Sequence, residues 1–138
     1  MFLDAIDSRI LSFLQENGRI SYASIAKEVG LTAAAVGQRV QKMVLEGVIE
    51  GFSVQVNPEK MGIRLQAIIT LKLHFSKTAI FNEKLKEFEE IQSCYRVTGE
   101  DCMIMKVHFK NNAHLVQFLD KISVYGSSKT NIIIDELV

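Results

Sequence analysis

The sequence predicts an α+β chain in which a small helical domain precedes a larger domain of strands and helices. Two patterns support this fold class. Apolar residues recur at helical spacing as far as Gly47, whereas strand-like alternation dominates beyond Pro58 and is interrupted by two helical segments. The 138 residues, 48% of them hydrophobic, can fill the core of one ordinary domain or of two small ones.

Three short helices are expected up to Glu50. Each ends at a glycine or at an Asn-Gly pair, and the second and third begin at Ser21 and Thr32, residue types that commonly cap a helix N-terminus. With their caps, the predicted helices span residues 6–18, 21–30 and 32–47.

The second and third helices meet the steric requirements of a helix-turn-helix. Ala26 is small where the two helices cross, Gly30 suits a turn with positive φ, and Val36 can pack back onto the second helix. These residues favour a winged-helix-like, DNA-binding helix-turn-helix. A purely structural three-helix bundle is the alternative that glycine-terminated helices also allow.

If the third helix enters the major groove, its exposed residues should contact bases and its longer polar side chains should reach phosphates. Gln38 could pair with adenine, and Arg39 with guanine or a phosphate. The run Ala33–Ala35 offers only apolar contacts, so loose sequence specificity is expected. The candidate DNA-binding residues are Ser21, Thr32, Ala33, Ala34, Ala35, Gly37, Gln38, Arg39 and Lys42.

The charge of the chain argues against strong DNA binding by a single copy. The formal net charge is zero, and up to Glu50 five basic residues stand against six acidic ones. Lys and Arg supply most of the sequence-independent affinity for DNA by neutralising phosphates. Useful affinity is therefore expected to need several copies acting on one duplex.

A linking strand is expected after the helices, because apolar residues alternate with polar ones until Asn57-Pro58 ends the run. The alternating apolar residues are Ile49, Phe52, Val54 and Val56. The predicted regions are a helix-turn-helix domain at 1–50, a linker strand and connection at 51–62, and a second domain at 63–138.

Six elements are expected in the second domain, in the order strand, helix, strand, strand, helix, strand. The predicted strands are 65–75, 91–97, 103–109 and 131–138, and the predicted helices are 78–88 and 112–122. This order is the ferredoxin-like βαββαβ arrangement, in which two helices cover one face of a four-stranded antiparallel sheet. Because the first strand is so apolar, the other face is expected to be covered by the sheet of a second copy.

The whole sequence resembles the Lrp/AsnC, or feast/famine, family of transcriptional regulators. The segments that carry the resemblance are Leu3–Asp7, Asn17–Ser21, Ile25–Thr32, Arg39-Val40, Gly47–Ile49, Gly51-Phe52 and Asn57-Pro58. The resemblance implies a DNA-binding head, a strand linker and a ferredoxin-like effector and assembly domain called RAM. It also implies double-stranded DNA as a partner, homodimers that associate into tetramers or octamers, and an amino acid or other small molecule as effector.

In this family the effector site involves the loop after the second RAM strand, at contacts between dimers. The candidate effector-binding residues here are Thr98, Gly99, Glu100, Asp101 and Cys102, with Tyr125, Gly126 and Ser127 in a second loop. Many relatives have an aspartate three residues after the glycine, whereas this chain has Cys102 there and Asp101 one position earlier. A tight hairpin turn without a ligand is the alternative.

No enzymatic, metal-binding or membrane function is expected. The three histidines and two cysteines form no metal-ligand motif, and no catalytic triad or phosphate-binding loop occurs. Without a signal peptide or an apolar span, a cytoplasmic, nucleoid-associated protein with no cofactor is expected. The main alternative to an effector-responsive regulator is an architectural protein that bends or wraps DNA as an oligomer.

Overall fold

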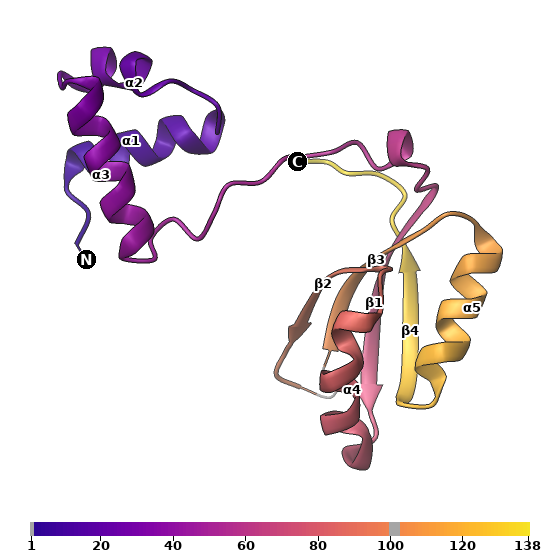
Figure 1. Ribbon diagram of the computed structural model, residues 1–138. Coiled ribbons are helices and arrows are strands. Elements are labelled where there is room, and N and C mark those ends of the chain that lie inside the picture. Colours follow the sequence, from indigo (N-terminus) through magenta and orange to yellow (C-terminus); the bar gives the residue numbers. More distant parts are fainter. Residues whose placement is uncertain (1, 100–102) are drawn as a thin grey trace. The chain divides into compact units, whose positions relative to one another are not determined.

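The structure is a computed structural model that describes residues 2–99 and 103–138. The chain divides into an N-terminal unit, Met1–Gln55, and a C-terminal unit, Val56–Val138, each with its own hydrophobic core (Figure 1). None of the described helices is both long and apolar enough to cross a membrane.

Three helices form the N-terminal unit: α1 (Ala5–Glu16), α2 (Tyr22–Val29) and α3 (Ala33–Leu45). Each begins after a residue whose side chain accepts a hydrogen bond from the backbone of the first turn, and these caps are Asp4, Ser21 and Thr32. The helices enclose a core whose fully buried members are Ile10, Ile25, Val36 and Met43. The predicted order of three short helices is confirmed.

The turn between α2 and α3 has the geometry that a helix-turn-helix requires. Gly30 ends α2 in the left-handed region, with φ of 70°, and the Leu31 N–H donates to the Ala26 carbonyl oxygen at 3.1 Å. Ala26 and Val36 are both buried, as their predicted packing roles demand. The turn therefore fixes α3 closely against α2.

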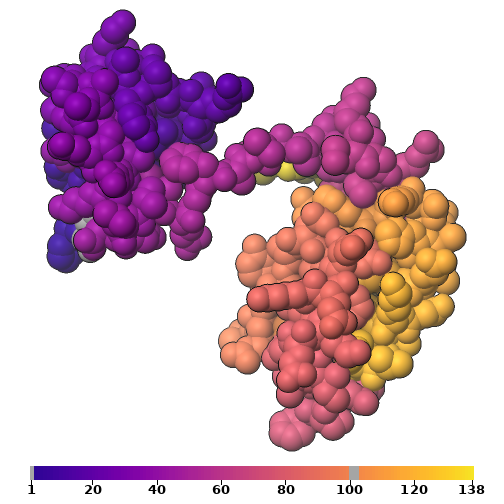
Figure 2. Space-filling view, in the orientation of Figure 1, coloured from indigo at the N-terminus to yellow at the C-terminus, as the bar shows by residue number. Residues whose placement is uncertain are grey.

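The C-terminal unit is a four-stranded antiparallel sheet with two helices. Its main elements are β1 (Leu65–Leu73), α4 (Thr78–Lys84), β2 (Ile91–Arg96), β3 (Met103–Phe109), α5 (Asn112–Ser123) and β4 (Gly126–Ile132), with 3-10 turns at Glu59–Met61, Phe75–Lys77 and Leu85–Glu87. The strand order is β2-β3-β1-β4, which confirms the ferredoxin-like arrangement. In Figure 1 and Figure 2, α4 lies in front of the strands.

Both helices pack on the same face of the sheet. Phe81 of α4 and Phe118 of α5 are fully buried against alternate side chains of the two central strands. The fully buried strand residues are Ala67, Ile69, Leu71, Met105, Val107 and Phe109.

The opposite face of the sheet is mixed rather than apolar. Because side chains alternate along a strand, β1 presents Gln66, Ile68, Thr70 and Lys72 on this face. Most of the apolar run of β1 thus points towards the helices, and the cover of the opposite face by a second copy stays a prediction.

The last strand begins five residues earlier than the sequence predicts, at Gly126 instead of Asn131. The β1–β4 pairing runs from Leu73↔Gly126 to Ala67↔Ile132. β4 has the polar sequence GSSKTNI, which is tolerated at the edge of a sheet, so it has no apolar alternation to reveal it. The predicted loop residues Gly126 and Ser127 therefore belong to this strand.

The structure has no linking strand at residues 50–57, where the sequence predicts one. A strand needs a neighbour that completes its hydrogen bonds, and no described segment of this chain supplies one. Phe52, Val54 and Val56, which carry the alternating pattern, are instead exposed.

Gly126 lies where β1 and β4 are too close for a side chain. A Cβ at this position would overlap the backbone oxygen of Lys72 and lie 2.8 Å from its carbonyl carbon. We expect Gly126→Ala to lower the free energy of unfolding by about 3 kcal/mol, because backbone rather than a flexible side chain must move. Gly51→Ala is the matched control, since a Cβ there meets no atom within 4 Å. Urea unfolding measures both, and equal stability of the two variants would contradict this strand packing.

Candidate DNA-binding surface and effector pocket

The outer face of α3, defined as Ala34, Gln38 and Gln41, points away from the core of the N-terminal unit. Val36 and Val40 are buried on the other side of the helix, and all three outer-face residues are exposed. The side chains of Gln38 and Gln41 make no hydrogen bond to any residue that the structure describes. Their amide groups are therefore available to an external partner.

Lys42 flanks this outer face and is one of the predicted DNA-binding residues. Gln41 belongs to the face but was not predicted. Lys42 is exposed and forms no ion pair with residues 2–99 or 103–138. It lines a hollow of about 520 Å³ together with Gln38 and Ala35. Gln41 could have been found from sequence, because it follows Gln38 by three residues and Ala34 by seven, which is helical spacing.

Arg39, which the sequence predicts to contact guanine or a phosphate, forms ion pairs within the N-terminal unit. Its Nη1 atom lies 2.7 Å from Asp4 Oδ2 and 2.7 Å from Asp7 Oδ1. Asp7 is only 4% exposed, and a buried carboxylate is costly unless it is paired and hydrogen-bonded. Arg39 therefore ties α3 to the beginning of α1.

The two carboxylates that hold Arg39 also form the capping box of α1. Asp4 Oδ1 accepts a hydrogen bond from the Asp7 N–H at 2.7 Å, and Asp7 Oδ2 accepts one from the Asp4 N–H at 3.2 Å. The Asp7 N–H and the Arg39 guanidinium lower the pKa of Asp4, and hydrogen bonds to Asp4 and Asp7 raise the pKa of Arg39. Asp4 and Arg39 therefore remain charged at neutral pH.

Ser21 and Thr32, two further predicted DNA-binding residues, serve as helix caps. Ser21 Oγ accepts a hydrogen bond from the Ser24 N–H at 3.1 Å, and Thr32 Oγ1 accepts one from the Ala35 N–H at 3.1 Å. These bonds satisfy first-turn N–H groups that would otherwise have no partner. Their oxygens are committed to the fold of α2 and α3.

The predicted effector loop lies partly outside the described residues. Thr98 and Gly99 follow β2 and are exposed, and Gly99 has φ of 103°, a conformation suited to glycine. Glu100, Asp101 and Cys102, the other predicted residues of this loop, lie outside the part of the chain that the structure describes.

The other three predicted effector residues, Tyr125, Gly126 and Ser127, differ in their exposure. Tyr125 is 8% exposed, and its ring packs edge-on against Phe81 with centroids 5.3 Å apart. Gly126 is buried beside the backbone of β1, whereas Ser127 is exposed. Tyr125 and Gly126 therefore contribute to packing of the C-terminal core.

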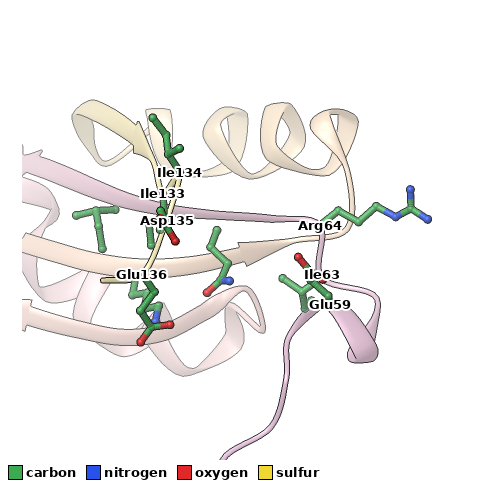
Figure 3. A pocket seen from close by; sticks show the side chains of 10 residues that line it. Glu59, Ile63, Arg64, Ile133, Ile134, Asp135 and Glu136 are labelled. Carbon is green, nitrogen blue, oxygen red and sulfur yellow. The ribbon is translucent and has the colours of Figure 1, made fainter. Parts of the chain in front are cut away.

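A hollow of about 420 Å³ occurs elsewhere on the C-terminal unit, where the tail after β4 passes the sheet (Figure 3). The residues that line it are Glu59, Ile63, Arg64, Gln66, Ile68, Lys106, Ile133, Ile134, Asp135 and Glu136. Figure 3 shows that the Arg64 side chain points away from the tail residues. None of the predicted effector residues that the structure describes, Thr98, Gly99, Tyr125, Gly126 and Ser127, lines this hollow.

Neither metal ligands nor a reactive thiol are found in the part of the chain that the structure describes. No group of three or more His, Cys, Asp or Glu side chains there could hold a metal ion. Burial raises the pKa of the Cys94 thiol, which disfavours the thiolate that a nucleophile requires.

A helix-turn-helix with an unbonded polar outer face, carried on one chain with a ferredoxin-like domain, defines a DNA-binding regulator with a separate domain for ligand binding or assembly. The chain belongs to the Lrp/AsnC family of transcriptional regulators. Residues 3–44 match the AsnC-type helix-turn-helix domain, and residues 66–138 match the Lrp/AsnC ligand binding domain.

Relatives of similar length support this assignment. The HTH-type transcriptional regulator FL11 of Pyrococcus abyssi is 37% identical over 133 residues, which cover 96% of this chain and 88% of that protein. The HTH-type transcriptional regulator LrpA of Bacillus subtilis is 31% identical over 135 residues, covering 96% and 98%. These relatives are regulators, which agrees with the expectation that the chain is not an enzyme.

Solved structures agree with the predicted fold class over the full chain. LrpC of Bacillus subtilis has a TM-score of 0.94 at 25% identity and covers 100% of this chain and 99% of its own. A feast or famine regulatory protein of Mycobacterium tuberculosis, complexed with L-methionine, has a TM-score of 0.92 at 29% identity and covers 99% and 95%.

Removal of Arg39 should destabilise the N-terminal unit, because the Asp7 carboxylate is then left buried without its partner. We expect Arg39→Ala to lower the Tm by several degrees at neutral pH, measured by circular dichroism, with Lys42→Ala as the control that leaves it unchanged. The pKa of Asp4 is lowered in the folded state, so its stabilisation is present above its ordinary pKa of about 4 and is lost as the pH falls through the lowered value. The difference in Tm between wild type and Arg39→Ala should therefore narrow in acid, and a difference independent of pH would contradict this pairing.

Proposed function

We propose that this regulator binds duplex DNA by placing the outer face of α3 in the major groove. The observation that carries the proposal is that this face is polar and unbonded, while the apolar side of α3 is buried in the N-terminal core. Glutamine amides can form paired hydrogen bonds with adenine, which suits Gln38 and Gln41 to base contacts. Lys42, at the flank of the face, is suited to a phosphate.

We also propose that several copies act on one duplex, because one head has few free cations. Arg39 is paired within the unit, and Arg9 Nη2 donates to the Glu28 carbonyl oxygen at 2.6 Å. The other basic residues of the head are Arg19, Lys27 and Lys42. A second copy of the chain could cover the exposed linker residues and the mixed sheet face, and the resulting dimers could build a tetramer or octamer.

We further propose that an amino acid bound to the C-terminal unit modulates DNA binding. The support is the match to a ligand binding domain and a structural relative that is complexed with L-methionine. Gly99, with φ of 103°, begins the loop in which backbone N–H groups could approach such a ligand. A second copy would complete the pocket.

Lys42→Ala should weaken binding to any duplex, since loss of a phosphate contact does not depend on sequence. We expect lower affinity and a salt slope that is smaller by about one, measured by titration at several salt concentrations. Lys86→Ala, which removes an exposed lysine of the C-terminal unit, is the matched control. Identical salt slopes for both variants would refute the proposed placement of α3.

L-methionine should stabilise the folded chain if the C-terminal unit binds an amino acid. Mass action predicts about 2.7 kcal/mol of stabilisation when the ligand is present at about a hundred times its Kd. A thermal shift series with L-methionine and a panel of other amino acids measures this effect, with D-methionine as the control. Absence of any shift across the panel would favour the architectural alternative, in which the chain organises DNA without an effector.

A further inference from the structure

Gly37 occupies the interior of α3, where glycine is unfavourable for a helix. The ring of Tyr22, which packs against this position, explains the glycine. A Cβ at position 37 would lie 3.3 Å from Cδ2 and 3.4 Å from Cε2 of the Tyr22 ring, a contact tighter than ordinary packing. The missing side chain of Gly37 therefore makes room for an aromatic ring from another helix.

The ring of Tyr22 flanks the outer face of α3. Gly37 directly precedes Gln38 and lies four residues before Gln41, so the ring rests on the stretch of α3 that carries both residues. Tyr22 is the first residue of α2 and is 42% exposed. In a docked helix-turn-helix, the helix that precedes the reading helix crosses the DNA backbone, which puts this end of α2 near phosphates.

The hydroxyl of Tyr22 makes no hydrogen bond to any residue that the structure describes. The cap oxygens of Ser21 and Thr32 already accept backbone N–H groups, and the alanines at the start of α3 have no polar side-chain atoms. Tyr22 thus presents, at the start of α2, a hydroxyl donor that has no partner among the described residues and is carried on a ring packed against Gly37.

We propose that Tyr22 is a DNA-contacting residue whose ring is seated on Gly37 and whose hydroxyl donates a hydrogen bond to a phosphate oxygen at the edge of the groove. The inference rests on the proposed role of α3 as the reading helix. The DNA-binding surface is then built from two helices, with Gly37 as the site where α3 accepts a side chain of α2.

The variant Tyr22→Phe tests this role, because it keeps the ring on Gly37 and removes only the hydroxyl. We expect affinity to fall about tenfold, the lower end of the contribution of a hydrogen bond to a charged group. The loss should be the same for two unrelated duplexes, with unchanged Tm and unchanged salt slope, since a neutral donor releases no counterion. Tyr95→Phe, which removes a hydroxyl from a 64% exposed tyrosine of the C-terminal unit, is the matched control.

A double-mutant cycle with Gly37→Ala separates a DNA contact from a packing role. The added methyl group should displace the Tyr22 ring and weaken binding, but it should weaken binding less when Tyr22→Phe is already present. Full affinity of Tyr22→Phe, or an equal loss in Tyr95→Phe, would overturn the inference. If Tyr22→Phe and Lys42→Ala both leave affinity and salt slope unchanged, the proposed placement of α3 is wrong. If Tyr22→Phe alone has no effect on affinity, only the proposed role of Tyr22 is wrong.

Discussion

One nearly buried carboxylate ties the body of α3 to the start of α1. Asp7 is 4% exposed, and a carboxylate so far from water is tolerated only with a charged, hydrogen-bonded partner. Arg39 supplies it at 2.7 Å from the middle of α3, while Asp4 shares the same guanidinium and completes the capping box of α1. The start of α1 and the body of α3 are thereby fixed together, and the outer face of α3 is left without internal bonds.

This constraint also lowers the capacity of a single head to bind phosphates. Two of the arginines of the head make contacts within the unit. Arg39 pairs with the carboxylates of Asp4 and Asp7, and Arg9 donates a hydrogen bond to the carbonyl oxygen of Glu28. Charge that stabilises the helical unit is not available for counterion release. This shortage of free cations in one head is the physical reason for the proposal that several copies act on one duplex, and the apolar residues of the linker, Phe52, Val54 and Val56, are exposed in the single chain.

Local signals predicted much of this fold. The caps Ser21 and Thr32 and the left-handed Gly30 follow from residue type, and the strand Met103–Phe109 was predicted at its observed bounds. The two failures share a cause, because local alternation decides neither of them. β4 is a polar edge strand, and residues 50–57 have no strand neighbour among the described residues. In the site, the pairing of Arg39 with carboxylates 32 and 35 residues away is invisible to any local pattern.

In the proposed docking of α3, the ion pairs of Arg39 bear on which bases the head can distinguish. Arginine and lysine are the side chains that commonly read guanine; Arg39 Nη1 pairs with two carboxylates, which leaves Lys42 as the unpaired cation at the flank of the outer face among the described residues. The outer face then offers two glutamine amides, which suit adenine, and the methyl group of Ala34, which suits the methyl group of thymine. In the proposed docking, these groups favour A·T pairs without fixing a long sequence. Further selectivity would have to come from DNA shape, because A·T-rich tracts have a narrow minor groove and distinctive stiffness that phosphate contacts on both sides of the groove can sense.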